Sequence, residues 1–343
     1  MPQHDARLAL IHTWLTQELG LHLQRLEPAS NDASFRRYFR AFIGERTLVI
    51  MDAPPEKEDV RPYLKVSRLL EGVGVHVPHV HEADTTRGLL LLEDLGSTQY
   101  LARLIAGDDP ELLYGDALSA LADIQVRGQD AARELQPYDY AALMREMALM
   151  PEWFCARHLA LELSAEEREI IDAAFDFLIA EALAQPTVFV HRDYHSRNLM
   201  VLATRNPGIV DFQDALRGPM GYDLVSLLKD CYISWPRDRV ERWVEGYRST
   251  LWVRGSIARS SQEFLRGFDM IGVQRHIKVL GIFARLWYRD GKAGYLNDLP
   301  LTLEYVRDTC KRYEELADLS GLLERRFVPE LPRANVRITE QFK

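Results

Sequence analysis

The sequence predicts an α/β protein of the α+β type with two lobes, a small one rich in β-strands and a larger one that is mainly helical. Between residues 21 and 94 the chain breaks into short apolar runs of strand length, whereas from about residue 97 onward its pattern is mainly helical. The chain has 343 residues, which is enough for two separate hydrophobic cores. We therefore expect an N-terminal lobe at residues 1–95 and a C-terminal lobe at residues 96–343.

The N-terminal lobe is expected to begin with a helix and to continue as a small sheet. Residues 5–19 carry apolar side chains at helical spacing, and Gly20 suits the position after the last turn. A second helix is expected near residues 59–71, with Pro62 in its first turn, where a proline is tolerated. The expected strands fall within residues 21–26, 34–43, 46–52, 76–83 and 88–95.

The C-terminal lobe is expected to be helical except at residues 188–214, where short strands carry two motifs. Residues 274–289 are expected to form a helix that is apolar on most sides. The polar tail after Pro329 is expected to be loosely ordered.

The composition is that of an ordinary globular protein, with 47% hydrophobic and 27% charged residues. No apolar run approaches the roughly 20 residues needed to cross a bilayer, and the first residues lack a secretory pattern. We therefore expect a cytoplasmic protein with no membrane partner, and we separately expect it to be a monomer. The formal charge of −9 argues against non-specific nucleic-acid binding. The three cysteines, which are far apart, are expected to be buried free thiols.

Two motifs indicate phosphoryl transfer from ATP. Residues 190–198 have the sequence VHRDYHSRN and residues 209–213 the sequence IVDFQ, so that their aspartates lie 211 − 193 = 18 positions apart. In this layout Asp193 accepts the proton of the substrate hydroxyl, while Asn198 and Asp211 supply hard oxygen ligands for Mg²⁺. A single loop aspartate more often caps a turn, but the surrounding pattern favours catalysis.

The neighbours of these residues support the same interpretation. Asp211 follows an apolar strand, where an unpaired carboxylate would cost several kcal/mol, so a metal ion is its natural partner. His191 is expected to hold the loop by hydrogen bonds. His195 either contacts the substrate or takes no part in binding, and the sequence leaves both possibilities open.

The segment that follows, DFQDALRGPMGYDL at residues 211–224, resembles the aminoglycoside phosphotransferase and choline kinase group of small-molecule kinases. The resemblance implies a bilobal, protein-kinase-like fold with ATP and Mg²⁺ as cofactors. It also implies that Asp223 is a structural residue at the start of the next helix, where we expect it to be the N-cap.

The N-terminal lobe departs from the kinase pattern. Met51 stands where a strand lysine normally grips the phosphates, and the usual helical glutamate partner is not evident. We expect Arg37, or less favourably Arg36, to replace the lysine, although a solvated arginine is the plainer alternative. The nucleotide contacts predicted besides Arg37 are Asn31 and Ser34 in the loop that replaces a Gly-rich loop, and Val49, Glu93 and Leu95 near the adenine and the hinge.

Four cationic residues on the 274–289 helix fall within an arc of roughly 80°. They are Arg275, Lys278, Arg285 and Arg289. Such a stripe on a buried helix either pairs with acidic neighbours inside the protein or faces an anionic ligand, and both possibilities stay open.

Residues 30–40, 190–214 and 274–286 also resemble a narrower family, the bacterial anomeric sugar kinases of cell-wall recycling. The resemblance implies phosphorylation of the C1 hydroxyl of the amino sugars N-acetylmuramate and N-acetylglucosamine. N-Acetylmuramate carries a lactyl carboxylate, which agrees with a cationic stripe. The expected sugar contacts are His195, Asp214, Arg217 and Arg275. The alternatives are a kinase of the same fold for another small alcohol (an aminoglycoside, choline or homoserine) or a nucleotide-binding regulator with weak catalysis.

Overall fold

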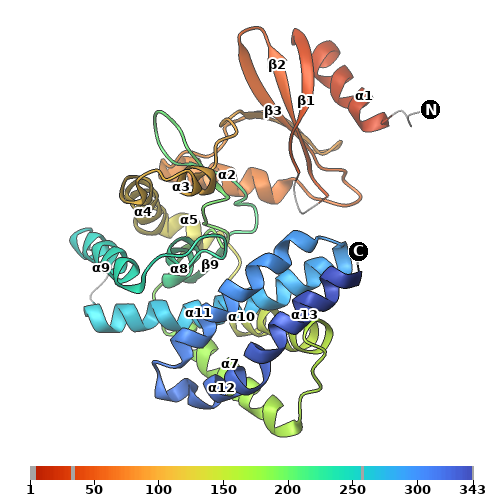
Figure 1. Ribbon diagram of the computed structural model, residues 1–343. Helices are drawn as coiled ribbons and strands as arrows, with labels where there is room; N and C mark the ends of the chain where they lie inside the picture. The colour runs from red at the N-terminus through yellow and green to blue at the C-terminus, as the bar shows by residue number, and fades with distance from the viewer. Residues whose placement is uncertain (1–4, 32–34, 256–258, 342–343) are drawn as a thin grey trace. The chain divides into compact units, whose positions relative to one another are not determined.

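The computed structural model describes residues 5–31, 35–255 and 259–341 (Figure 1). The chain divides into two compact units, one made of residues 1–124 and 197–215 and the other of residues 125–196 and 216–343. Residues 96–124 and 197–215 therefore group with the N-terminal sheet, which differs from a simple division at residue 95. The assignment of nucleotide binding to residues 1–95 and of catalysis to residues 96–343 stays a prediction.

The first unit contains a five-stranded antiparallel sheet with the strand order β1-β2-β3-β5-β4. Its strands are β1 (Leu23–Asn31), β2 (Arg37–Ile43), β3 (Arg46–Asp52), β4 (Val80–Asp84) and β5 (Leu89–Glu93). The predicted mixed α/β fold class and the five strands are confirmed, but β1 runs to Asn31, beyond the predicted end at residue 26 and into the segment expected to be a loop.

Helix α1 (Ala6–Thr13) covers one face of this sheet and continues as the π-helix η1 (Trp14–Glu18) (Figure 1). The core of this layer includes Ile11 and Leu15 from the helical segment and Ile50 from β3. Gly20 has a φ of 65°, as expected of a glycine after the last helical turn.

The other elements of the first unit follow the sheet or return to it. The predicted helix near residues 59–71 is α2 (Arg61–Val73), and it has Pro62 in its first turn. The remaining elements are α3 (Tyr100–Ile105), the start of α4 (Pro110–Arg127), and the two-stranded pair β7 (Leu199–Met200) and β8 (Gly208–Ile209).

The second unit is built around the long helix α10 (Ser261–Asp290). Ser260 and Glu263 form a capping box at its start, and Gly291 ends it with a φ of 70°. Every residue from Phe268 to Gly281 is buried, because helices pack around the middle of α10. These are α7 (Ala165–Leu183), α8 (Gly221–Leu228), α11 (Leu299–Cys310) and the π-helix η2 (Met150–His158).

The second unit also contains a two-stranded pair, β6 (Thr187–Val190) with β9 (Leu216–Pro219). Its other elements are α5 (Gln129–Arg133), α6 (Tyr140–Met147), α9 (Arg237–Val253), η3 (Ala293–Asp298), η4 (Glu314–Leu316), α12 (Ala317–Leu322), η5 (Leu323–Phe327) and α13 (Val328–Gln341). The prediction of a loosely ordered tail was wrong, since α13 is helical. Leu331 and Ala334 lie three residues apart and are both buried, which fixes one face of this helix.

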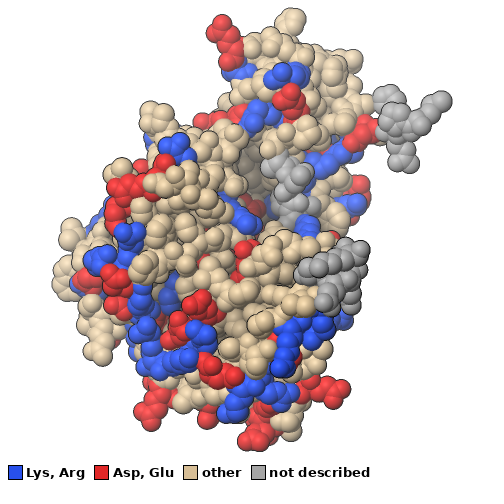
Figure 2. All heavy atoms as spheres, viewed as in Figure 1, with Lys and Arg blue, Asp and Glu red and all other residues tan. Residues whose placement is uncertain are grey.

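Cys155, Cys231 and Cys310 are buried free thiols, as predicted. No helix in the described residues is long and apolar enough to span a membrane. Figure 2 shows acidic and basic side chains interspersed on the visible face.

Candidate active site

The loop that carries Asp193 begins directly after β6, in the second unit. Asp223 holds the start of this loop, because its carboxylate accepts the backbone N–H of His191 at 2.7 Å and that of Arg192 at 2.9 Å. The prediction that Asp223 is the N-cap of the next helix was wrong. Helix α8 begins at Gly221, so Asp223 lies in its first turn, and its oxygens serve the neighbouring loop instead of the helix end.

Asp230 holds the other end of the loop. It lies just after α8 and accepts the backbone N–H of Ser196 at 3.0 Å together with the Ser196 hydroxyl. Its second oxygen accepts the backbone N–H of Tyr232 at 3.0 Å. Sequence reasoning missed Asp230, which lies outside both motifs and directly after the end of α8. The loop is thus fixed at both ends by α8 and the residues that follow it.

The environment of Asp193 favours its ionised form. Burial by itself would raise the pKa of Asp193, but the charges of Lys278, His195, Arg192 and Arg275 lower the pKa below its ordinary value. A carboxylate that stays ionised near neutral pH can accept a proton from a substrate hydroxyl. The structure therefore brings two of the predicted substrate residues, His195 and Arg275, into the electrostatic surroundings of Asp193.

A half-buried carboxylate, that of Glu146, pairs with two of these cations. Glu146 forms an ion pair with Arg192 and a second one with Lys278, whose Nζ lies 3.2 Å from Glu146 Oε2. The Lys278 ammonium also donates to the Tyr222 hydroxyl at 3.0 Å. Sequence reasoning did not single out Glu146. Lys278 thus pairs internally, which was one of the two possibilities left open for the cationic stripe.

Asn198 and Asp211 lie together in the first unit. They flank the pair of strands β7 and β8, where the backbone N–H of Val210 donates to the Asn198 carbonyl at 3.0 Å. The Asn198 amide Nδ2 lies 3.4 Å from Asp211 Oδ2. Asp211 has a φ of 65°, an uncommon value for a residue other than glycine and one frequent at functional sites.

The neighbourhood of Asp211 fits a hard divalent cation. Gln213 donates from Nε2 to Asp211 Oδ1 at 2.8 Å, while its Oε1 is buried and has no hydrogen-bond partner among the described residues. Amide and carboxylate oxygens are the ligand types that Mg²⁺ accepts. Within the described ranges no group of three or more His, Cys, Asp or Glu side chains is placed to hold a metal.

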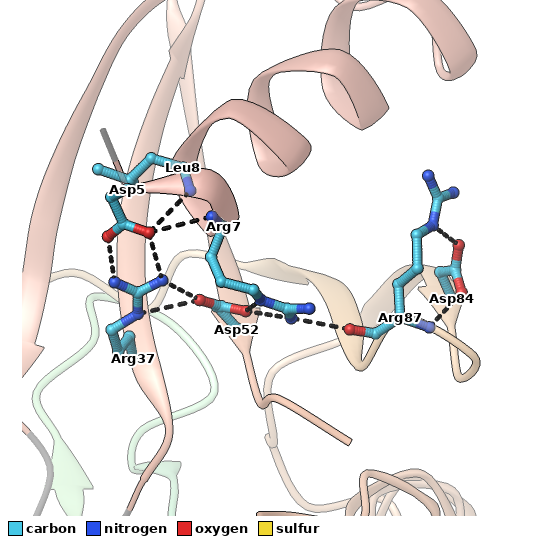
Figure 3. Close-up of polar contacts among 7 residues, drawn as sticks. All are labelled: Asp5, Arg7, Leu8, Arg37, Asp52, Asp84 and Arg87. Atoms are coloured by element: carbon cyan, nitrogen blue, oxygen red, sulfur yellow. Dashed lines mark hydrogen bonds and ion pairs between the residues drawn. The ribbon is translucent and has the colours of Figure 1, made fainter. Parts of the chain in front are cut away.

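Of the two candidate arginines, Arg36 is the one that the structure brings to Asp211. Its Nη2 lies 3.5 Å from Asp211 Oδ1, and its side chain is only 11% exposed. Arg37 lies instead in a cluster with Asp5, Arg7 and Asp52, where it donates to the fully buried Asp52 carboxylate at 2.6 Å (Figure 3). The geometry favours Arg36 over Arg37 as the replacement for the strand lysine, because the Arg37 charge is already matched by two aspartates.

The other predicted nucleotide residues occupy the sheet and the segment after it. Val49 pairs with Arg40 on β2 and with Leu92 on β5. The Glu93 carboxylate lies 3.0 Å from His76 Nε2, and Leu95 is buried where it packs against Gly208. Asn31 ends β1, but its side chain and the whole of Ser34 lie outside the described residues.

The predicted sugar contacts do not all lie in one unit. The His195 ring meets the Tyr232 ring edge-on at 5.3 Å between centroids. Arg275 is buried, and its Nη1 donates to Cys231 Sγ at 3.7 Å. Arg217 lies on β9 opposite Phe189 in the second unit, whereas Asp214 is exposed and belongs to the first.

Three features together define the class of small-molecule kinases with a protein-kinase-like fold. They are the five-stranded antiparallel sheet, the ionised loop aspartate of the helical unit, and the Asn–Asp pair that follows this aspartate in the sequence. The chain belongs to the phosphotransferase enzyme family, whose model matches residues 25–258.

Relatives of known name are similar over most of their length. The chain is 50% identical over 330 residues to a protein of Pseudomonas aeruginosa named N-acetylmuramate/N-acetylglucosamine kinase, covering 93% of this chain and 96% of the relative. A protein of the same name from Neisseria meningitidis serogroup B is 46% identical over 299 residues, which cover 86% and 88% of the two chains.

Solved structures share the fold at much lower identity. The choline kinase LicA from Streptococcus pneumoniae has a TM-score of 0.62 at 12% identity, covering 88% of this chain and 99% of that one. The ADP-bound aminoglycoside phosphotransferase APH(2'')-Ib has a TM-score of 0.58 at 13% identity, covering 89% and 99%. The predicted kinase-like fold and phosphotransferase class are thus confirmed.

Proposed function

We propose that this phosphotransferase uses ATP to phosphorylate the anomeric C1 hydroxyl of N-acetylmuramate and N-acetylglucosamine in cell-wall recycling. The substrate assignment is supported by the 50% identity, over nearly the whole of both chains, to a kinase named for these two sugars. The observation on which the chemistry depends is Asp193, a carboxylate kept ionised by surrounding cations on a loop fixed at both ends. A monomeric, cytoplasmic enzyme is part of the same proposal.

Asp193 accepts the proton of the C1 hydroxyl as its oxygen attacks the γ-phosphorus of ATP, the bond from that phosphorus to the β,γ-bridging oxygen breaks, and ADP leaves. An anomeric hydroxyl is more acidic than the other hydroxyls of a sugar, so removal of its proton depends less on the strength of the base. Positioning of the acceptor and neutralisation of phosphate charge then dominate the rate. Asp193 stays ionised for this role because four neighbouring charges lower its pKa, those of Lys278, His195, Arg192 and Arg275.

Asn198 and Asp211, with the buried Oε1 of Gln213 beside them, are the residues that would hold Mg²⁺. The ion would neutralise charge on the ATP phosphates. Arg36 lies at Asp211 and would contact the same phosphates in place of the lysine that Met51 replaces. Arg37 would then stabilise the sheet through Asp52.

The remaining contacts stay part of the proposal. Asn31 and Ser34 would lie near the phosphates, and Val49, Glu93 and Leu95 near the adenine. Asp214 and Arg217 would contact the sugar.

A coupled assay of ADP release tests the proposed function. We expect Mg²⁺-dependent turnover with N-acetylmuramate and N-acetylglucosamine, and little or none with choline, homoserine or an aminoglycoside. The product should lose its reducing end, because the phosphate occupies C1. Turnover of choline or an aminoglycoside in place of the two sugars would overturn the substrate assignment, and absence of turnover with every acceptor would favour a nucleotide-binding regulator.

A further inference from the structure

We infer that Arg285 on α10 binds the lactyl carboxylate of N-acetylmuramate and thereby sets the preference between the two sugars. This inference rests on the proposed function. The two sugars share the ring and the N-acetyl group, and they differ at C3, where only N-acetylmuramate carries the acid. A residue that distinguishes them should therefore be a cation without an internal partner.

The contacts of α10 separate Arg285 from the other three cations of the stripe. Lys278 pairs with Glu146, and Arg289 pairs with Asp290 at 2.8 Å in an exposed position. Arg275 lies beside Cys231. Arg285 is half-buried, and its Nε is buried without a hydrogen-bond partner among the residues that the structure describes.

The electrostatic surroundings show the same difference. Burial and the charge of Arg289 lower the pKa of Arg285, and the nearby acids Asp290, Glu152 and Glu146 do not restore it. The pKa values of Arg275, Lys278 and Arg289 are raised, because anionic or polar neighbours outweigh the effect of burial. The charge of Arg285 is thus the one left uncompensated, and a half-buried, uncompensated guanidinium is stabilised by an anionic ligand.

The position of Arg285 suits a substituent of the acceptor sugar. It follows Lys278 by seven residues, so the two share one face of α10 and lie about 10.5 Å apart along the helix axis. Lys278 is the largest of the cationic influences on Asp193. From Lys278 toward Arg289 this face changes from buried to exposed, and Arg285 lies between the two.

Arg275, which the sequence suggested as a sugar contact, is less suited to the carboxylate. Its Nε also has no partner in the described part of the chain, but Cys231, Tyr222, Asp193 and Asp230 all raise its pKa. The positive charge of Arg275 is therefore balanced by these neighbours, which include Asp193. Arg285 lies ten positions after Arg275 on α10, about 15 Å farther along the helix axis, as the C3 substituent of the sugar lies away from the reacting C1 oxygen.

The test compares the sugar preference of Arg285→Ala with that of a matched control. We expect the ratio of kcat/KM for N-acetylmuramate to kcat/KM for N-acetylglucosamine to fall about 10- to 100-fold, as for the loss of a charge-assisted hydrogen bond. Arg285→Lys should recover part of this ratio, since it keeps the charge but not the planar fork. Arg289→Ala, an exposed arginine on the same face, should keep the wild-type ratio.

A second measurement uses the wild-type enzyme with the methyl ester of N-acetylmuramate, which removes the charge without changing the protein. The ester should lose the same factor relative to the free acid. An unchanged ratio in Arg285→Ala, or equal use of acid and ester by the wild-type enzyme, would overturn the inference. Neither result would affect the proposed function, which fails only if the wild-type enzyme phosphorylates neither sugar.

Discussion

Arg36 and Asp211 form an ion pair, with 3.5 Å between Nη2 and Oδ1, on the unit that carries Asn198. The pair places a guanidinium beside a proposed metal ligand in a chain that has Met51 where kinases carry a lysine. A guanidinium can donate two parallel hydrogen bonds to phosphate oxygens, so an arginine can replace a lysine at this position.

The first prediction follows from that pair. Arg36→Ala should raise the KM for ATP about 10-fold or more, because a charge-assisted phosphate contact is lost. Steady-state kinetics at saturating sugar measure this effect. Arg37→Ala is the matched control, and it should lower the free energy of unfolding by about 1 to 3 kcal/mol, because the buried Asp52 carboxylate loses a donor. A larger rise in KM for Arg37→Ala than for Arg36→Ala would contradict this assignment.

The second prediction concerns the base. Asp193→Asn keeps the shape of the side chain but cannot accept the proton, so kcat should fall by about 10²- to 10⁴-fold. The affinity for ATP should change little, since Asp193 is not a proposed phosphate ligand. Pre-steady-state rates and calorimetric titration with a non-hydrolysable nucleotide separate the two effects. Retention of near wild-type kcat would remove Asp193 from the mechanism.

The sequence predicted the main elements of the fold because their signals are local. Alternating strands, the helix with Pro62 and the two motifs each depend on residues close together in the chain. Helix α13 was missed because its sequence is polar on average and has Pro332 inside it, where a proline normally ends or kinks a helix.

The choice between Arg36 and Arg37 could not be made from the sequence, because both arginines are adjacent at the start of one strand. The partners that distinguish them are Asp5 and Asp52 for Arg37 and Asp211 for Arg36. Asp211 lies 175 positions after Arg36 (211 − 36 = 175), so only the fold brings the pair together. For the same reason the sequence did not reveal that Glu146 joins Arg192 to Lys278.

The third prediction tests Asp230 as a positioning residue. Both carboxylate oxygens of Asp230 accept hydrogen bonds, one from Ser196 and the other from Tyr232. In Asp230→Asn an N–H₂ group, which cannot accept a hydrogen bond, replaces one of these oxygens, so at least one of the contacts is lost. We expect kcat to fall at least about 10-fold with the KM for ATP nearly unchanged, because the loop that carries Asp193 is displaced. The pH dependence of kcat should shift as well.

Ser196→Ala, which removes only the hydroxyl contact to Asp230, should have a smaller effect, and the double variant should be less impaired than the two single effects combined. Asp238→Asn is the control, since Asp238 lies on α9 in an exposed pair with Arg242. If Asp230→Asn lowered only the thermal stability and left kcat and its pH profile unchanged, Asp230 would be a purely structural residue.

The fourth prediction concerns two buried histidines in the second unit, His158 and His276. Burial lowers the pKa of His158 from 6.5 to about 4 and that of His276 to about 3, so both are neutral in the folded protein at neutral pH. His276 Nε2 donates to the Lys229 carbonyl at 2.9 Å. The unfolded chain takes up these protons near pH 6.5, before the folded chain does, so stability present above that pH is lost as the pH falls toward about 4. For His158 the loss of stability is on the order of 3 kcal/mol.

Denaturant unfolding as a function of pH should show this decline in the free energy of unfolding. It should become shallower in His158→Gln and in His276→Gln, but not in His12→Gln, whose side chain is exposed. A decline of the same size in the double variant His158→Gln/His276→Gln would assign the acid sensitivity to carboxylates instead.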